Sequence, residues 1–179
     1  MIALVEPDVE PDAVPARVVV FMGTDHHPFA RLVEWVDRWA AAHPDIPCFI
    51  QHGPAPAPHH AKGTAYVSLE ELRATVSTAD VVVGHAGPGT IIDALEAGLV
   101  PVVLPRLARL GEVVDDHQVA FGRLMHEHGR AVCVEDERAL TAAIDHALAH
   151  PGAAPRPSPY EARSTITLVG DLIDGLLAR

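Results

Sequence analysis

Three short segments of the sequence combine glycine, histidine, threonine and carboxylate residues directly after apolar runs. They are Gly23-Thr24-Asp25-His26-His27, Gly84 to Thr90, and Pro105 to Gln118. In an open parallel sheet, ligands bind beyond the carboxyl ends of the strands. If each apolar run is such a strand, the three segments meet at one edge of the sheet. Backbone N–H groups, hydroxyls and imidazoles gathered there can bind an anion or a sugar.

The second segment has the composition of a phosphate-binding turn. Gly87 and Gly89 allow the backbone to approach a ligand closely, and a helix is expected from about 89 to 97. The first turn of a helix presents free N–H groups and the positive end of the helix dipole, which favour phosphate. The dinucleotide fingerprint is not met, because Ile92 stands where its third glycine would be. Spacing alone leaves a diphosphate site and a glycine turn without a ligand equally open.

The third segment ends in a polar run from Gly111 to Gln118 at the expected start of a helix. Its side chains can donate and accept hydrogen bonds, which suits sugar hydroxyls. The alternative is a helix N-cap, at Asp115 or Asp116, with solvated neighbours. Spacing alone favours this alternative.

The elements that must position these loops alternate between apolar runs and amphipathic segments. Strands are expected at 17–22, 47–51, 65–67, 80–84, 100–104 and 131–134. Helices are expected at 29–40, from Ser68 with Glu71 completing a capping box, at 89–97, from 115 or 116 to about 128, and around 140–148. The proline-rich stretch 52–63 is expected to be a loop. This alternation predicts an α/β fold: one Rossmann-like domain with a roughly six-stranded parallel sheet.

The domain organisation follows from composition along the 179 residues, a length that suits one ordinary domain. Residues 1–16 are acidic and rich in proline, and we expect a flexible tail without the basic start of a secretory signal. Residues 17–150 form the body of the domain. A linker over 151–162 and an amphipathic helix over 163–179 are expected to follow.

Charge and composition exclude several classes of function. The formal net charge is −11, from 24 acidic residues against 13 Lys and Arg, and a nucleic-acid binder needs a basic face. No apolar run reaches the roughly 20 residues of a membrane helix. Cys48 and Cys133 lie in apolar stretches and are expected to be reduced core residues.

The 12 histidines do not indicate a metal site. His59 and His60 lie in the proline-rich loop, and His126 and His128 do not share a helical face. No cysteine lies near either pair, so the spacing is poor for zinc. We expect solvated surface histidines and no bound metal.

A longer pattern now becomes recognisable. The run His85-Ala86-Gly87-Pro88-Gly89-Thr90-Ile91-Ile92-Asp93-Ala94, then Gly98, Pro101, Pro105 and Asp116-His117-Gln118, resembles the donor-binding C-terminal half of GT-B glycosyltransferases, family 28 in particular. The segment from Val20 to Phe29, together with Gly111 to Gln118, is similar to the PssE-type subunits of bacterial exopolysaccharide synthesis. The resemblance covers about residues 17–135.

The resemblance implies a role for each loop in binding a nucleotide-sugar. The diphosphate is bound by the loop that contains His85, Gly87, Pro88, Gly89 and Thr90. The ribose hydroxyls contact Asp93, which is shorter than the Glu usual in the family. The donor sugar contacts His117 and Gln118. The base lies against Tyr66, Val67, Ser68 and Leu72, and Gly23 and Thr24 face the phosphates or the acceptor.

The reaction implied is inverting transfer of a sugar from a UDP-sugar co-substrate to a lipid-linked saccharide, without a cofactor or metal. His85 would stabilise the leaving UDP. The base that deprotonates the acceptor comes, in two-domain relatives, from the acceptor half, although His26 or His27 could assist. Short relatives of this kind act with a membrane-anchored acceptor-binding subunit. This places the chain in the cytoplasm, peripheral to the membrane through its partner.

Two questions stay open at this point. The helix 163–179 could dock onto the partner subunit or cover its own sheet. The chain could also be a non-catalytic nucleotide-sugar-binding or regulatory subunit. A sugar-nucleotide 2-epimerase, a further enzyme class on the same architecture, needs two domains and is not expected in 179 residues.

Overall fold

The computed structural model describes residues 17–151 together with Thr167 and Gly170. The predicted tail over 1–16 lies outside the described residues. The predicted linker and C-terminal helix also lie outside them, apart from residues 151, 167 and 170. Among the described residues, no helix has the length and apolar character needed to cross a membrane.

Six parallel strands form one sheet in the order β3-β2-β1-β4-β5-β6. The strands are β1 (Val18–Phe21), β2 (Cys48–Gln51), β3 (Lys62–Thr64), β4 (Val81–His85), β5 (Val102–Leu104) and β6 (Val132–Cys133). The chain adds strands on one side of β1 and then returns to its other side with β4. This reversal of strand order opens a crevice between the carboxyl ends of β1 and β4, where ligands bind in such sheets.

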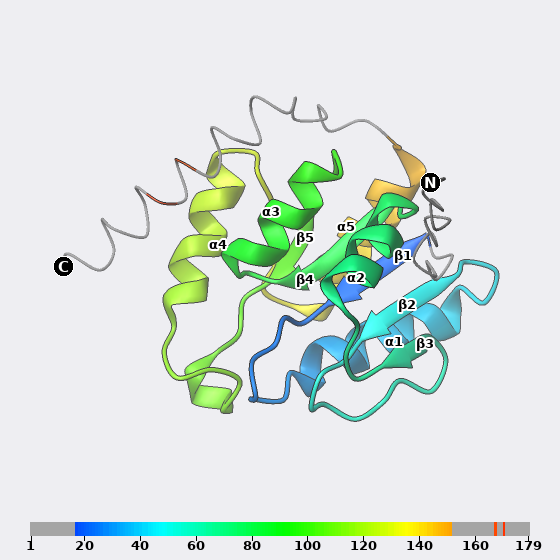
Figure 1. Ribbon diagram of the computed structural model, residues 1–179, viewed down its shortest axis with the longest axis horizontal. Coiled ribbons are helices and arrows are strands. Elements are labelled where there is room, and N and C mark those ends of the chain that lie inside the picture. The colour runs from blue at the N-terminus through cyan, green and yellow to red at the C-terminus, as the bar shows by residue number, and fades with distance from the viewer. Residues whose placement is uncertain (1–16, 152–166, 168–169, 171–179) are drawn as a thin grey trace, which may run out of the picture.

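Helices cover both faces of the sheet (Figure 1). Helices α1 (Ala30–Ala42) and α5 (Glu137–Ala149) contact each other on one face. Helices α2 (Leu69–Ser77), α3 (Pro88–Glu96) and α4 (His117–Glu127) cover the other face, and a short 3₁₀ turn (Ala108–Leu110) precedes α4. The predicted α/β architecture with six parallel strands is confirmed.

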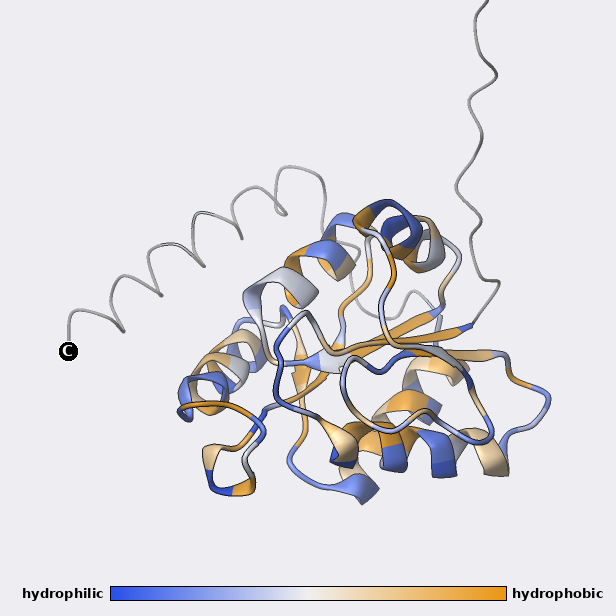
Figure 2. Ribbon diagram, turned by 60° about the horizontal axis from the view of Figure 1, so that its bottom comes forward, coloured by the Kyte–Doolittle hydropathy of each residue, from blue (hydrophilic) through white to orange (hydrophobic). Residues whose placement is uncertain are grey.

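Strand β1 shows why the central strands are apolar throughout. Val18 and Val20 pack with the helices α1 and α5, whereas Val19 and Phe21 pack against α2 and α3. All four side chains are buried, since successive residues of a strand point to opposite faces and both faces are covered. Figure 2 shows this continuous hydrophobic layer between the helices.

The third strand differs from its prediction. Strand β3 is Lys62–Thr64, which overlaps the end of the stretch 52–63 expected to be a loop, while the predicted strand 65–67 lies in the connection to α2. Lys62 and Gly63 are exposed at the sheet edge, so the strand carries no apolar signal. A Cβ on Gly63 would lie 2.6 Å from the Pro58 ring, which shows how closely the proline-rich loop packs on this strand.

Other local predictions are confirmed. Ser68 caps α2, and its hydroxyl and the Glu71 carboxylate each accept the other residue's backbone N–H, as in a capping box. Cys48 is buried and Cys133 is partly buried, and both are free thiols. Burial raises the pKa of Cys48 to about 12, so this thiol stays protonated.

Candidate functional site

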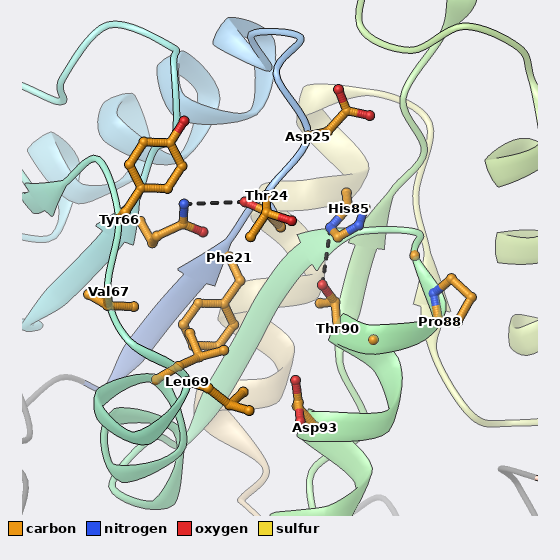
Figure 3. A pocket seen from close by; sticks show the side chains of 15 residues that line it. Phe21, Thr24, Asp25, Tyr66, Val67, Leu69, His85, Pro88, Thr90 and Asp93 are labelled. Carbon is orange, nitrogen blue, oxygen red and sulfur yellow. Dashed lines mark hydrogen bonds between the residues drawn. The ribbon is translucent and has the colours of Figure 1, made fainter.

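A cavity of about 530 Å³ lies at the carboxyl ends of β1 and β4, between α2 and α3 (Figure 3). Its lining comes from four separate segments of the chain. The lining residues are Phe21, Gly23, Thr24, Asp25, Gln51, Tyr66, Val67, Leu69, Leu72, His85, Gly87, Pro88, Gly89, Thr90 and Asp93. The fold therefore brings together most of the residues predicted from the sequence to bind a donor.

One end of the cavity is the N-terminus of α3. Gly87 is the N-cap and has no side chain, and Pro88 occupies the first turn, where its missing N–H costs nothing. A Cβ added to Gly89 would meet no protein atom within 4 Å, so this glycine faces open space in the cavity. Free N–H groups at a helix start, with room in front of them, form a site for an anion such as a phosphate.

The imidazole of His85 fills a space that only glycines leave open. A Cβ on Gly87 would lie 2.2 Å from its Nε2 atom, and a Cβ on Gly23 would lie 2.8 Å from its Cε1 atom. Gly23 also has a φ of +69°, a conformation that residues with a side chain rarely adopt. A Cβ on Gly84 would instead lie 2.5 Å from the methyl group of Thr90, the residue whose hydroxyl contacts His85. Gly23 and Gly87 thus leave room for the His85 ring at the cavity wall.

His85 is neutral at pH 7. Burial lowers its pKa to about 4, because desolvation disfavours the imidazolium, and the charge of Arg106 lowers it further. Its Nδ1 atom lies 3.1 Å from the Thr90 hydroxyl (Figure 3). A bound anion would favour the protonated ring, so His85 can gain a proton when a phosphate arrives.

The opposite end of the cavity is apolar. Tyr66 and Leu69 are each 56% exposed, and Val67 and Leu72 line the cavity beside them. Exposed aromatic and aliphatic side chains around a cavity offer the planar contact that a nucleobase needs. Leu69 was not predicted; it is the first residue of α2, after the Ser68 cap.

Asp93 lies between these two ends, on the second turn of α3 (Figure 3). One of its carboxylate oxygens is 3.6 Å from a guanidinium nitrogen of Arg73 on α2. The Asp93 side chain is 20% exposed and lines the cavity. A carboxylate between an anion site and an apolar end is suited to accept hydrogen bonds from ribose hydroxyls.

Five predicted residues do not line this cavity. Ser68 is used as the α2 cap. His117 is exposed and its ring contacts the Asp115 carboxylate, while the buried Gln118 accepts a 3.2 Å hydrogen bond from the backbone N–H of Arg106. The remaining two, His26 and His27, lie in the loop after β1.

In that loop, the Asp25 carboxylate accepts hydrogen bonds from the backbone N–H of His27 at 2.8 Å and its ring at 2.7 Å. Asp25 faces the cavity, and His26 is largely exposed. The three residues offer ligand atoms within 4.8 Å of one another, although Arg106 places a positive charge near Asp25. The backbone N–H bond to His27 holds the pKa of Asp25 below its usual value.

Three buried polar residues were missed by the sequence reading. Gln51 ends β2 and donates to the carbonyls of Gly23 at 3.3 Å and Ala65 at 2.8 Å, which joins both sides of the cavity. Arg106 and Glu112 follow β5, and both are almost completely buried. Gln51 and Arg106 each follow an apolar run, whereas Glu112 stands in the polar run 111–118, and neither pattern separates a buried side chain from a solvated one.

The comparisons with known proteins agree with this geometry. Residues 17–165 match the glycosyltransferase family 28 C-terminal domain. The chain belongs to this family. Binding of a nucleotide-sugar donor is typical of the family 28 domain. The search of curated proteins found no match.

Solved glycosyltransferase structures share the fold. The glycotransferase of kitacinnamycin is 24% identical, with a TM-score of 0.64 over 88% of this chain and 42% of its own. The calicheamicin glycosyltransferase CalG4 is 15% identical, with a TM-score of 0.58 over 94% of this chain and 44% of its own. Os79 from O. sativa, in complex with UDP, is 11% identical, with a TM-score of 0.56 over 86% of this chain and 36% of its own. The chain therefore spans less than half the length of each, and it matches the C-terminal half of the GT-B architecture.

Proposed function

We propose that this chain binds the donor and carries the leaving-group chemistry of an inverting glycosyltransferase, which transfers a sugar from a UDP-sugar to a lipid-linked saccharide. One observation carries the proposal. The free helix start at Gly87–Thr90, the Asp93 carboxylate and the apolar end at Tyr66 and Leu72 line a single cavity. These three environments match, in order, the diphosphate, the ribose and the base of a nucleotide.

In the proposed reaction, the acceptor hydroxyl attacks the anomeric carbon from the face opposite to UDP. The new C–O bond forms as the bond to the diphosphate oxygen breaks, and UDP leaves with that electron pair. The helix N-terminus, the Thr90 hydroxyl and His85 stabilise the charge that grows on the diphosphate. Such protein dipoles do the work of a divalent metal, so we propose a metal-independent hexosyltransferase.

The hydroxyl proton must pass to a base. Of the described residues, Asp25 is the one carboxylate besides Asp93 that lines the cavity, and it already accepts two hydrogen bonds from His27. We therefore propose that a second, membrane-anchored subunit supplies the base and the acceptor site, as in PssE-type enzymes, and holds this chain at the cytoplasmic face of the membrane. We propose that His117, whose charge acts on His85, and Gln118 beside it contact the donor sugar.

The alternative is a subunit that binds a nucleotide-sugar without catalysing transfer. The paired state of Asp25 and the short Asp93 favour this alternative. A non-catalytic subunit would bind the same nucleotide in the same cavity. It would differ from a transferase only in the absence of sugar transfer.

Two measurements test the proposal. Calorimetry of the chain with UDP, TDP, GDP and ADP should give the tightest binding for UDP, and binding of none of them would contradict a donor site. Release of UDP from a panel of UDP-sugars is then measured with the chain co-expressed with a candidate acceptor subunit and a lipid-linked acceptor. UDP binding without any release under these conditions would favour the non-catalytic alternative.

A further inference from the structure

Arg106 is the most deeply buried charged side chain among the described residues, with 1% of its surface exposed. It lies two residues after β5, and its guanidinium packs 4.7 Å from the centre of the Phe29 ring. Its Nε atom is buried without a hydrogen-bond partner. Burying a guanidinium with one N–H unsatisfied is costly, so the contacts of the other two nitrogens need an explanation.

Those contacts all go to backbone carbonyls of two loops. One terminal nitrogen donates to the carbonyls of His27 and Glu112, each at 2.8 Å, and the other donates to the carbonyl of Met22 at 2.9 Å. Met22 and His27 belong to the loop after β1, and Glu112 belongs to the loop after β5. A single planar fork thus connects the two loops.

The two loops flank the end of β4. In the sheet order, β1 and β5 lie on either side of β4, whose last residue is His85. Met22 is followed by Gly23, which contacts the imidazole of His85 so closely that a Cβ would collide with it. Gln51 holds the same segment from the β2 side, through the Met22 N–H at 3.2 Å and the Gly23 carbonyl at 3.3 Å, and the Arg106 contact with the Met22 carbonyl holds it from the β5 side.

We infer that Arg106 is a positioning residue for the phosphate end of the cavity: it connects the loops 22–29 and 105–112 across the end of β4 and so holds Gly23 and Thr24 against His85. This inference rests on the proposed donor site. Arg106 does not line the cavity, so it acts through these loops and not by touching the nucleotide. The base end, at Tyr66 and Leu72, is not among its contacts.

The inference predicts a selective loss that can be measured with two nucleotides. In Arg106→Met, the affinity for UDP should fall at least tenfold and the affinity for UMP less than threefold, because only the second phosphate depends fully on the positioned loops. General misfolding would instead lower the fraction of protein that can bind. Calorimetry would show this as a lower number of binding sites per chain. Arg38→Met is the matched control, because it makes the same substitution at an exposed arginine and removes only the ion pair with Glu137. It should bind both nucleotides like the wild type.

Arg106→Lys keeps the test decisive if Arg106→Met does not fold. Lysine retains the charge and the apolar stem, but a single ammonium cannot reach carbonyls of both loops in the geometry of the fork. We expect the same selective loss of UDP affinity, together with faster amide hydrogen exchange in 22–29 and 105–112 and unchanged exchange in 62–68. Wild-type UDP affinity and wild-type exchange in Arg106→Lys would overturn the inference, as would an equal loss for UDP and UMP.

The outcomes separate this inference from the proposed function. If the wild-type chain binds neither nucleotide, the donor site itself is wrong. If the wild type binds UDP and the Arg106 variants bind it equally well, only the positioning role is wrong.

Discussion

The Nδ1 atom of His85 lies 3.1 Å from the hydroxyl of Thr90, so the last residue of β4 is connected to the first turn of α3. Both residues line the cavity, and the contact holds the imidazole beside the free N–H groups of the helix. Since the pKa of His85 is about 4, the ring is neutral before a ligand binds. The protonation of His85 should therefore report the arrival of a diphosphate.

The first prediction is that UDP binding is coupled to proton uptake by His85. A nearby anion stabilises the imidazolium, so the pKa of His85 in the complex should lie above its free value of about 4. Between those two values the complex holds more protons than the free protein, so the contribution of His85 to UDP affinity should rise as the pH falls through the pKa of the complex towards about 4. Calorimetry in two buffers of different ionisation enthalpy measures the uptake. The same titration with His85→Asn subtracts the titration of UDP itself, and equal uptake by both proteins would contradict the prediction.

The second prediction separates stability from binding at the glycine turn. Gly89→Ala places a methyl group in open cavity space, and alanine is favoured over glycine in a helix by about 0.5–1 kcal/mol. The variant should be at least as stable as the wild type in urea unfolding, while its UDP affinity should fall at least tenfold, about 1.4 kcal/mol. Gly87→Ala should behave differently, because its Cβ would lie 2.2 Å from the Nε2 atom of His85. We expect a destabilisation of about 1–3 kcal/mol there. Unchanged UDP affinity in Gly89→Ala would show that no phosphate approaches this turn.

The third prediction concerns the ribose. Asp93→Ala should weaken UDP binding by about 1–3 kcal/mol, because a ribose hydroxyl would lose its acceptor. The loss should be smaller for 2′-deoxy-UDP if the 2′-hydroxyl is one of the groups bound. Arg73→Met is the control, since it removes the ion pair with Asp93 and leaves the carboxylate in place. Wild-type UDP affinity in Asp93→Ala would remove this residue from the site.

The fourth prediction concerns the ion pair between Arg31 on α1 and Glu112 in the loop after β5. Arg31 and Glu112 make two hydrogen bonds, at 2.9 and 2.8 Å, and both side chains are largely buried. Glu112→Gln should lower the free energy of unfolding by about 3 kcal/mol, because it leaves a poorly solvated guanidinium without a counter-charge. Arg38 and Glu137 have the same two-bond geometry at the surface, so Glu137→Gln should cost about 0–1 kcal/mol. Equal costs in urea titrations would contradict the role of burial.

Much of the fold could be predicted because both faces of the central strands are buried. Val18 to Phe21 and Val81 to Val83 are continuous β-branched or aromatic runs, and such runs indicate buried parallel strands. The edge strand Lys62–Thr64 was misplaced because it lacks this burial. Its side chains are mostly exposed, and its backbone hydrogen bonds to β2 leave no trace in the residue types.

The sequence by itself determined the alternation of strands and helices along the chain and the glycine turn after β4, while the role of that turn in phosphate binding is implied by the family resemblance and stays a prediction. These depend on local chemistry: apolar runs, caps, and glycines at positions where a side chain would collide. Only the tertiary structure decided which polar residues are buried. Nothing in the sequence marks Arg106 or Gln118 as buried, yet their partners are backbone carbonyls and N–H groups of loops that lie close only after β1, β4 and β5 have aligned. Such partners are separated by up to 84 positions along the chain, and residue types carry no information about contacts over that distance.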